Sequence, residues 1–306
     1  MLQNVRVKIV VSGGSGFIGA ALVKRLAARG DEVVVLSRNA SNGLEWHPPR
    51  QSAWSKVAGD ADVVINLAGE NIGEGRWTQA RKERLMSSRL DATRALVEAM
   101  QNNLSQRRTF ISASAVGYYG FAGEDVFEES SPRGAGFLAE LTEKWEAAAR
   151  EANPFARVVI LRLGVVLDRH GGALAKLLLP FRLGAGGPIG SGKQWMSWVD
   201  RDDVLRAIEW SIDRDEARGV YNVTSPNPVR NRDFARALGR ALHRPALLPA
   251  PGHALRLLFG EMADEALLGG QRVMPSRFTR EGFTFEYPTI EQSVVHALQS
   301  ARTERS

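Results

Sequence analysis

Short apolar runs alternate with amphipathic stretches from the start of the chain. The β-branched run Val5–Val11 leads directly into a glycine-rich stretch, GGSGFIG. Apolar side chains then recur at helical spacing, at Ile18, Ala21, Leu22 and Leu26. Gly30 ends this helix, and Val33–Leu36 is the next buried run. The opening segment therefore predicts a strand, a tight turn, a helix and a second, parallel strand.

The same alternation continues through the first half of the chain. Further strands are predicted at Asp62–Leu67, Thr109–Ser112 and Val158–Leu163. The clearest amphipathic helix carries Met86, Leu90, Thr93, Val97 and Met100, and another helix includes Trp145–Glu151. Strands that alternate with helices indicate an α/β fold, in which a doubly wound parallel sheet is covered on both faces.

After Gly164 the pattern loosens. The glycine-dense stretch Gly184–Gln194 predicts a loop, and Trp195–Val199 and Val220–Val223 predict short strands. We expect Asp202 or Asp203 to cap a helix that runs to about Asp213, and Asn231 or Asp233 to cap a helix through Leu242. The string GFTFEYP near the end of the chain has the pattern of a hairpin.

This change of pattern predicts two lobes. Residues 1–165 form the sheet domain, to which later strands return from the second half of the chain. Residues 166–306 form a smaller α+β lobe, whose last segment begins at about Pro249. The sequence shows no internal repeat and no linker.

Composition excludes several classes of protein. The chain has no cysteine, so it has neither disulfides nor thiolate metal sites, and its five histidines lack the spacing of metal ligands. Forty basic and thirty-four acidic residues give a net charge of +6, but the charges are dispersed, and nucleic acid is not an expected partner. No apolar run reaches the ~18 residues that mark a membrane-spanning helix, so we expect a cytoplasmic protein without a membrane partner.

Three glycines at regular spacing suggest a nucleotide site. Gly13, Gly16 and Gly19 follow a strand and open a helix, as the dinucleotide-binding turn requires. The first glycine allows the sharp turn, the second lets the backbone approach a pyrophosphate, and the third lets the helix pack closely on the sheet. The unpaired amides of the helix N-terminus then face the phosphates.

The end of the second strand predicts which dinucleotide binds. An enzyme that uses NAD usually has Asp or Glu here, which accepts hydrogen bonds from the ribose hydroxyls. This chain has Ser37 and Arg38, a hydroxyl donor and a planar cation that suit the 2′-phosphate of NADP. A solvated surface arginine is the alternative interpretation of Arg38.

Several strings together resemble a known family. GGSGFIG, the element Asn66–Gly69 and Ser114 before Tyr-Tyr-Gly resemble the extended short-chain dehydrogenase/reductases. NLAGENI, SSRLDATRALVEA, KWEAAAR, LRLGVVL, LLPFRLGAGGPIGSGKQ and LLGGQRVMP resemble one atypical branch, the epimerase family proteins, over essentially the whole chain.

The resemblance implies a Rossmann-type domain that binds NADP(H) and a C-terminal substrate lobe. By position, it implies that the cofactor contacts Gly13, Ser15, Gly16, Phe17, Ile18 and Gly19 at the pyrophosphate, Ser37 and Arg38 at the 2′-phosphate, and Leu67, Ala68 and Gly69 at the ribose, with Arg89 and Val165 as further contacts.

The catalytic residues depart from the pattern of the family. The superfamily uses a Ser or Thr, a Tyr as general acid/base and a Lys four residues later. Ser114 fits the first position, but the Tyr and Lys positions hold Phe137 and Leu141, or Leu138 and Thr142 in the neighbouring register. Two tyrosines, Tyr118 and Tyr119, offer a phenol nearby.

Of these two we name Tyr118 as a candidate proton carrier. Glu70 is the other candidate, because it follows the end of a strand, where such folds bind ligands. Structural roles for both residues, an aromatic under the loop and a capping carboxylate, are the alternatives.

The sequence therefore predicts an NADP(H)-dependent oxidoreductase or epimerase-like enzyme for a small polar substrate, for which a nucleotide-linked sugar is one candidate. The rival is a protein that binds or senses NADP(H) without catalysis, which the missing Tyr and Lys favour. The sequence leaves open whether the protein is a monomer or a homodimer.

Overall fold

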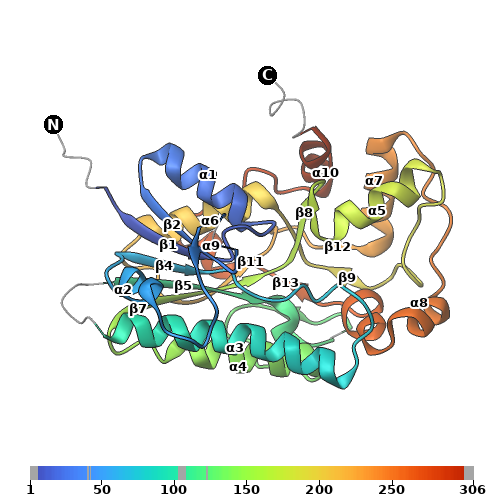
Figure 1. Ribbon diagram of the computed structural model, residues 1–306. Coiled ribbons are helices and arrows are strands. Elements are labelled where there is room, and N and C mark those ends of the chain that lie inside the picture. Colours follow the sequence, from blue (N-terminus) through green and yellow to red (C-terminus); the bar gives the residue numbers. More distant parts are fainter. Residues whose placement is uncertain (1–5, 40, 42, 103–107, 122, 300–306) are drawn as a thin grey trace.

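A parallel sheet forms the centre of the molecule (Figure 1). The computed structural model describes residues 6–39, 41, 43–102, 108–121 and 123–299. Within them, the main sheet has seven strands in the order β11-β7-β5-β4-β1-β2-β3, and every neighbouring pair is parallel. This is the doubly wound, Rossmann-type arrangement that the alternating pattern predicts.

The strands and helices that the apolar pattern predicts in this domain are present, together with a short strand at Leu44–Glu45 and short helices at Ala53–Gly59 and Ser276–Arg280 that it did not predict. The strands are β1 (Lys8–Ser12), β2 (Glu32–Ser37), β3 (Leu44–Glu45), β4 (Val63–Asn66), β5 (Arg108–Ala115), β7 (Ala156–Leu163) and β11 (Gly219–Val223). The helices are α1 (Gly19–Arg29), α2 (Ala53–Gly59), α3 (Gln79–Gln101), α4 (Phe137–Arg150), α6 (Arg201–Asp213) and α9 (Ser276–Arg280). The first residue of the predicted opening strand, Val5, lies outside the described residues.

Alternation of side chains along the strands divides the core into two layers. Ile9 and Val11 face one layer, which α1, α6 and the segment around Phe278 cover. Val10 faces the other layer, which α2, α3 and α4 cover. Because successive residues of a strand point to opposite faces, a continuous apolar run such as that of β1 requires helices on both sides.

The second lobe has its own core. Helices α5 (Gly172–Arg182), α7 (Asn231–Leu242) and α10 (Ile290–Gln299) pack around Trp198, beside β8 (Val165–Asp168) and β10 (Trp198–Asp200). The remaining elements are η2 (Val116–Tyr119), β6 (Val126–Phe127), β9 (Trp195–Met196), β12 (Val229–Arg230), α8 (Gly252–Phe259), η3 (Ala263–Leu268) and β13 (Arg272–Val273). As predicted, β11 returns from this half of the chain to the main sheet.

Two predictions for the second half are wrong. The single strand expected at Trp195–Val199 is divided: β9 pairs antiparallel with β12, whereas β10 pairs in parallel with β8. The division falls at Ser197, whose hydroxyl donates to Gln271 O at 2.8 Å and accepts from Val273 N at 2.9 Å. The string GFTFEYP forms no strand, because Phe283 and Phe285 are buried in the core that α6 covers.

The predicted helix caps are also wrong. Asp200 caps α6, accepting from Asp202 N at 2.9 Å. Asp203 instead accepts from the amides of Glu286 and Tyr287 at 2.7 and 3.0 Å, which attaches the C-terminal segment to α6. Helix α7 begins without a side-chain cap, and Asn231 Oδ1 accepts from Ile189 N. These polar side chains satisfy amides that are distant in the sequence, which local spacing does not reveal.

Asp203 is expected to make the stability depend on pH. Burial raises the pKa of its carboxyl above the ordinary value of 3.8, although the two amide hydrogen bonds and Arg206 act in the opposite direction. The folded protein then binds this proton more tightly than the unfolded chain does. Protonation of Asp203 therefore adds to the free energy of unfolding. This contribution is complete below pH 3.8 and is lost as the pH rises through the pKa of Asp203 in the folded state.

Asp203→Asn removes this titration. Urea denaturation at a series of pH values measures the free energy of unfolding of both proteins. We subtract the free energy of unfolding of the variant from that of the wild type. This difference should fall as the pH rises from about 3.8 towards neutrality. A difference that rises over the same range contradicts the argument.

Candidate functional site

The glycine turn has the conformation that a dinucleotide requires. Gly13 has a φ of +72°, and a Cβ added to it would lie 2.8 Å from the carbonyl carbon of Leu67. A Cβ on Gly19 would lie 2.2 Å from Gly13 O, so only glycine lets α1 approach the strand this closely. These are the roles that the sequence assigns to the first and third glycines.

The N-terminus of α1 presents amides without acceptors. Ile18 precedes the helix, which has no side-chain cap. Gly16 N donates to Gly13 O, but within the described chain the amides of Ser15, Phe17 and Ile18 have no acceptor. Ser15 and Gly16 are exposed. An exposed helix N-terminus with open amides fits a pyrophosphate, and no side chain fills the place where one would bind.

A groove of about 720 Å³ lies beside this turn. Ser15, Gly16 and Phe17 line it together with the outward face of α1. The opposite wall includes His170, from the turn between β8 and α5, and Arg201, the first residue of α6. Arg201 and His170 both contact Asp168, at 3.1 and 3.0 Å.

Ser37 and Arg38 lie at the same edge of the sheet, because β2 is the parallel neighbour of β1. Ser37 is buried, and its hydroxyl accepts from Asn39 N at 3.2 Å. Arg38 is exposed and forms no ion pair with the described residues. The guanidinium is therefore available to a ligand at the carboxyl edge of the strands.

A buried network fixes the turn after β4. Asn66 Oδ1 accepts from Ser12 Oγ at 2.8 Å and from Ala68 N at 3.2 Å, and Asn66 Nδ2 donates to Thr93 Oγ1 at 2.8 Å. Asn66 and Thr93 are fully buried. This network holds Leu67, Ala68 and Gly69, the predicted ribose contacts, next to Gly13 at the carboxyl edge.

Arg89 lies under this turn. Its guanidinium donates to Leu85 O and Glu70 O, both at 3.0 Å, and packs 5.2 Å from the Trp145 ring. A Cβ on Gly69 would lie 3.0 Å from Arg89 Cζ, so the two groups are in contact. Burial lowers the pKa of Arg89 to about 10, although the charge of Glu70 raises it. Arg89 thus supports the loop that the resemblance assigns to the cofactor.

Glu70 is engaged by arginines of α3. Its carboxylate forms an ion pair with the nearly buried Arg81, which also donates to Asn71 O at 2.6 Å, and it lies 3.7 Å from Arg84 Nε. Ser88 Oγ accepts from its amide. The sequence singled out Glu70 but missed Arg81, whose role shows only when α3 packs beside the loop.

Ser114 belongs to a buried charged cluster. Its hydroxyl donates to Glu146 Oε1 at 2.8 Å. Glu146, from α4, is fully buried and forms a bidentate pair with Arg162 of β7 at 2.7 and 2.9 Å, and Arg150 approaches it from the surface. Burial alone would lower the pKa of Arg162, but the carboxylate raises it above its ordinary value.

The two tyrosines of η2 meet the same guanidinium. Arg162 Cζ lies 3.4 Å from the centre of the Tyr118 ring. The Tyr119 hydroxyl accepts from Arg162 at 2.9 Å and donates to Asn222 Oδ1 at 2.7 Å. Burial raises the pKa of Tyr119 to about 12, so this phenol stays protonated at neutral pH. Tyr118 is half-buried, and its hydroxyl has no partner within the described chain.

Both alternative pairs for the Tyr and Lys positions, Phe137 with Leu141 and Leu138 with Thr142, lie in the first turns of α4. Leu138 packs against Gly117, where an added Cβ would lie 3.0 Å from Leu138 Cβ. Thr142 is buried and donates to Leu138 O at 2.7 Å. Glu265 of η3 accepts from the amides of Phe137 and Leu138 at 2.8 Å each, which caps the helix. No local pattern in the sequence indicated this cap.

The far side of the site is formed by the lobe. Val165 begins β8, and its amide donates to Ser197 O at 2.8 Å. Trp195 lies between two guanidiniums: Arg230 and Arg272 lie 4.0 and 4.7 Å from the centre of its ring. Gln194, at the end of the glycine-dense stretch, donates to the carbonyls of Ile189 and Leu267 and so fixes this loop.

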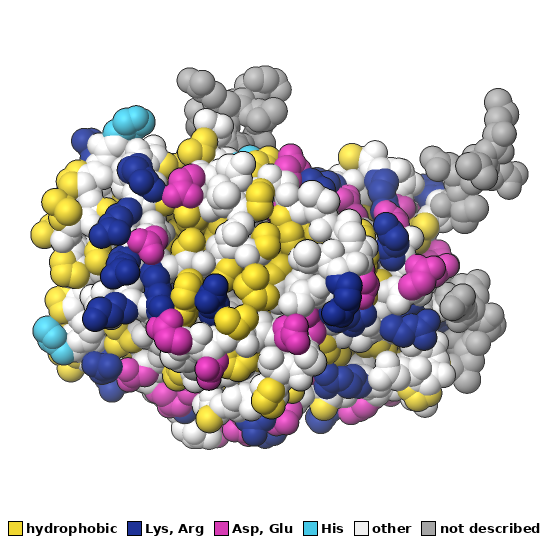
Figure 2. Space-filling model, turned by 180° about the vertical axis from the view of Figure 1, so that it is seen from behind, with side chains coloured by type: hydrophobic (Ala, Val, Ile, Leu, Met, Phe, Trp, Pro, Cys, Tyr) yellow, Lys and Arg dark blue, Asp and Glu magenta, His cyan; other side chains and the backbone are white. Residues whose placement is uncertain are grey.

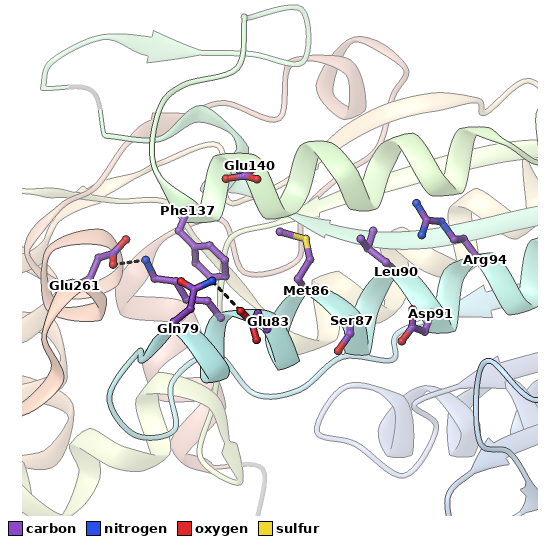
Figure 3. A pocket seen from close by; sticks show the side chains of 11 residues that line it. Gln79, Glu83, Met86, Ser87, Leu90, Asp91, Arg94, Phe137, Glu140 and Glu261 are labelled. Atoms are coloured by element: carbon purple, nitrogen blue, oxygen red, sulfur yellow. Dashed lines mark hydrogen bonds and ion pairs between the residues drawn. The ribbon is translucent and has the colours of Figure 1, made fainter.

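A second groove, of about 540 Å³, lies on the outer face of α3 and α4 (Figure 3). Met86 and Leu90 lie in it between the two helices, and Phe137 closes one end. These residues belong to the amphipathic face of α3, on which Thr93, Val97 and Met100 are buried, whereas Met86 and Leu90 are only half-buried. None of the predicted cofactor residues lines this groove.

The described part of the chain contains neither a metal-binding cluster nor a membrane-spanning helix. No group of three or more of its Asp, Glu and His side chains could hold a metal ion. None of its helices is both long and apolar enough to cross a membrane.

Comparisons with known proteins agree with this architecture. A family model described as the NAD dependent epimerase/dehydratase family matches residues 9–224, and a model described as a domain of unknown function, DUF1731, matches residues 250–297. The Epimerase family protein Mb2239 of Mycobacterium bovis is 41% identical over 293 residues, which cover 94% of this chain and 97% of that protein. Mouse Epimerase family protein SDR39U1 is 39% identical and is covered to 98%, with 94% of this chain.

Solved structures give the same result. The crystal structure of human epimerase family protein SDR39U1 with NADPH has a TM-score of 0.86 and 35% identity, and the match covers 95% of this chain and 99% of that one. MoeE5 in complex with UDP-glucuronic acid and NAD has a TM-score of 0.74 at 20% identity, with 97% and 99% covered. The second likeness concerns the fold alone.

The buried pair of Glu146 and Arg162 is expected to dominate the stability of this region. Glu146→Ala leaves a guanidinium and the Ser114 hydroxyl buried without an acceptor, so we expect the free energy of unfolding to fall by about 3–5 kcal/mol. Urea denaturation measures the change. Glu140→Ala, which breaks the exposed pair with Lys144 on the same helix, is the matched control and should cost less than about 1 kcal/mol. Equal effects of the two substitutions contradict the argument.

Proposed function

Because the chain belongs to the NAD-dependent epimerase/dehydratase family, we propose that it binds NADP(H) and acts as an oxidoreductase or epimerase-like enzyme on a small polar substrate. The observation that carries the proposal is the pairing of the open amides of α1 with the exposed Arg38 at one edge of the sheet. The NADPH in the crystal structure of human SDR39U1 supports the same cofactor. A nucleotide-linked sugar is the candidate substrate class.

The residues at the turn fit a dinucleotide. The amides of Ser15, Phe17 and Ile18 would hold the pyrophosphate. Gly13 and Gly19 allow the close backbone contacts that give the turn its shape. Ser37 and Arg38 would hold the 2′-phosphate. When bound, NADP(H) supplies or accepts a hydride.

Arg38 is expected to decide the preference between the two nicotinamide nucleotides. Arg38→Ala removes a charge-assisted contact to the 2′-phosphate, so affinity for NADPH should fall roughly 10- to 100-fold. Affinity for NADH, which lacks that phosphate, should change little. Isothermal titration calorimetry measures both, with Arg50→Ala, another exposed loop arginine, as the control. Wild-type protein that binds NADH as tightly as NADPH contradicts the assignment.

The buried cluster of Glu146 and Arg162 determines which polar groups around Ser114 are free to contact a substrate. Because the Ser114 hydroxyl donates its hydrogen to Glu146, its oxygen can only accept a hydrogen bond, and it would orient a substrate hydroxyl rather than a carbonyl. Tyr119 stays protonated between Arg162 and Asn222. Tyr118 is the phenol with an uncommitted hydroxyl, and the Arg162 guanidinium fixes its ring. We therefore propose Tyr118 as the group that carries the proton, with Glu70 as the second candidate.

Tyr118→Phe tests this assignment. The variant keeps the ring on Arg162 but loses the proton, so we expect turnover to fall by about 100-fold or more. Binding of NADPH and the melting temperature should be unchanged. Turnover is followed by the absorbance of the reduced nicotinamide against a set of metabolites. Glu70→Gln is the comparison: if it abolishes turnover and Tyr118→Phe does not, Glu70 carries the proton.

The second candidate function is NADP(H) binding without catalysis. Two observations favour it. Neither alternative pair for the superfamily's Tyr and Lys positions, Phe137 with Leu141 or Leu138 with Thr142, contains a Tyr or a Lys. The hydrogen of Ser114 is committed to Glu146. This alternative predicts tight NADPH binding with no oxidation or reduction of the nicotinamide in single-turnover experiments against the same metabolites.

A further inference from the structure

An apolar tip protrudes from the outer end of the C-terminal lobe. It consists of Leu179 on α5, Leu183 directly after this helix, and Leu247 and Leu248 in the loop after α7. The relative exposures of these four side chains are 66%, 75%, 80% and 59%. Large apolar side chains exposed to this degree and close together usually mark a surface that another phase or molecule covers.

The two parts of the tip are joined by hydrogen bonds. Leu248 N donates to Gly186 O at 3.2 Å, and Arg244 Nε donates to Arg182 O at 3.1 Å. Leu179 and Leu183 are one helical turn apart and therefore lie on the same side of α5. The tip lies at the end of the lobe remote from α2 (Figure 1).

Basic residues predominate in the two segments that carry the tip. The sequence contains no Asp or Glu in residues 169–199 or in residues 234–260, whereas these two segments contain eight Lys and Arg residues: Arg169, Lys176, Arg182, Lys193, Arg236, Arg240, Arg244 and Arg256. Lys and Arg side chains are prominent on the lobe, which lies on the left in Figure 2. Carboxylates from outside these segments pair with Arg236, Arg240 and Arg256.

At the tip itself the cations lack carboxylate partners. Arg182 and Arg244 are exposed, and neither forms an ion pair with the described residues. Arg182 directly precedes Leu183 in the sequence. Arg244 is joined to Arg182 by the hydrogen bond from its Nε to the Arg182 carbonyl. Protruding leucines beside unpaired guanidiniums match the layered chemistry of an anionic bilayer, with acyl chains below negatively charged headgroups.

We propose that this tip attaches the protein to an anionic lipid surface. The four leucines enter the boundary between acyl chains and headgroups, and Arg182 and Arg244 contact the lipid phosphates and carboxylates. The sequence predicted no membrane partner because it contains no apolar run long enough to span a bilayer. Attachment at the interface needs only protruding side chains, so that reasoning does not bear on it. The proposal is independent of the cofactor and of catalysis.

Sedimentation of the full chain with vesicles tests the proposal. We expect the wild-type protein to bind vesicles of phosphatidylcholine with phosphatidylserine, and to bind phosphatidylcholine alone at least about tenfold more weakly. Replacement of both arginines, Arg182→Gln with Arg244→Gln, should weaken binding to the anionic vesicles about thirtyfold. Leu247→Ser with Leu248→Ser should weaken it at least about tenfold. All four side chains are exposed, so the melting temperature should not change.

A matched control separates the tip from the net charge. Arg50→Gln with Arg94→Gln removes the same charge from exposed positions on the sheet domain and should leave vesicle binding unchanged. If both pairs of arginine substitutions weaken vesicle binding to the same extent, the overall charge explains the effect and the proposal is overturned. Wild-type protein that sediments with neither kind of vesicle also overturns it, and would leave a protein partner as the occupant of the tip.

Discussion

The ion pair of Glu146 and Arg162 connects the elements on which the site is built. It joins α4 to β7, and through Ser114 and Tyr119 it reaches β5 and η2. Removing two charges from water is costly, and only bidentate geometry with every remaining oxygen satisfied compensates for it. The pair therefore tolerates few alternative arrangements of these elements, and it fixes which tyrosine is free and which is not.

The helix N-termini around the sheet differ in whether a side chain accepts hydrogen bonds from their first amides. Thr78 caps α3, Asp200 caps α6, and Glu265 from the C-terminal segment caps α4. The N-terminus of α1 has no such side chain, and its amides face solvent. Side-chain oxygens thus cap α3, α4 and α6, whereas α1, like α2 and α7, begins without a side-chain cap. Under the proposed function, the amides of α1 would bind the phosphates of the cofactor.

The C-terminal segment is part of the sheet domain as much as of the lobe. Besides the Glu265 cap, Asp203 holds the amides of Glu286 and Tyr287, and β13 pairs with β6 beside η2. Gln271 donates to Val116 O at 2.8 Å. These contacts attach the C-terminal segment to the start of α4, to η2 and to β6.

The sequence alone determined the sheet domain and the cofactor turn. Apolar periodicity is a local property, and the glycines at 13, 16 and 19 act through backbone geometry that only glycine allows, so both can be recognised without coordinates. The amide partners of Asp203 and Asn231, the division of the chain at Ser197, and the commitment of Ser114 to Glu146 depended on tertiary structure. Each is a polar group that pairs with a partner distant in the sequence, and burial, which forces every such group to find a partner, exists only once the chain has folded.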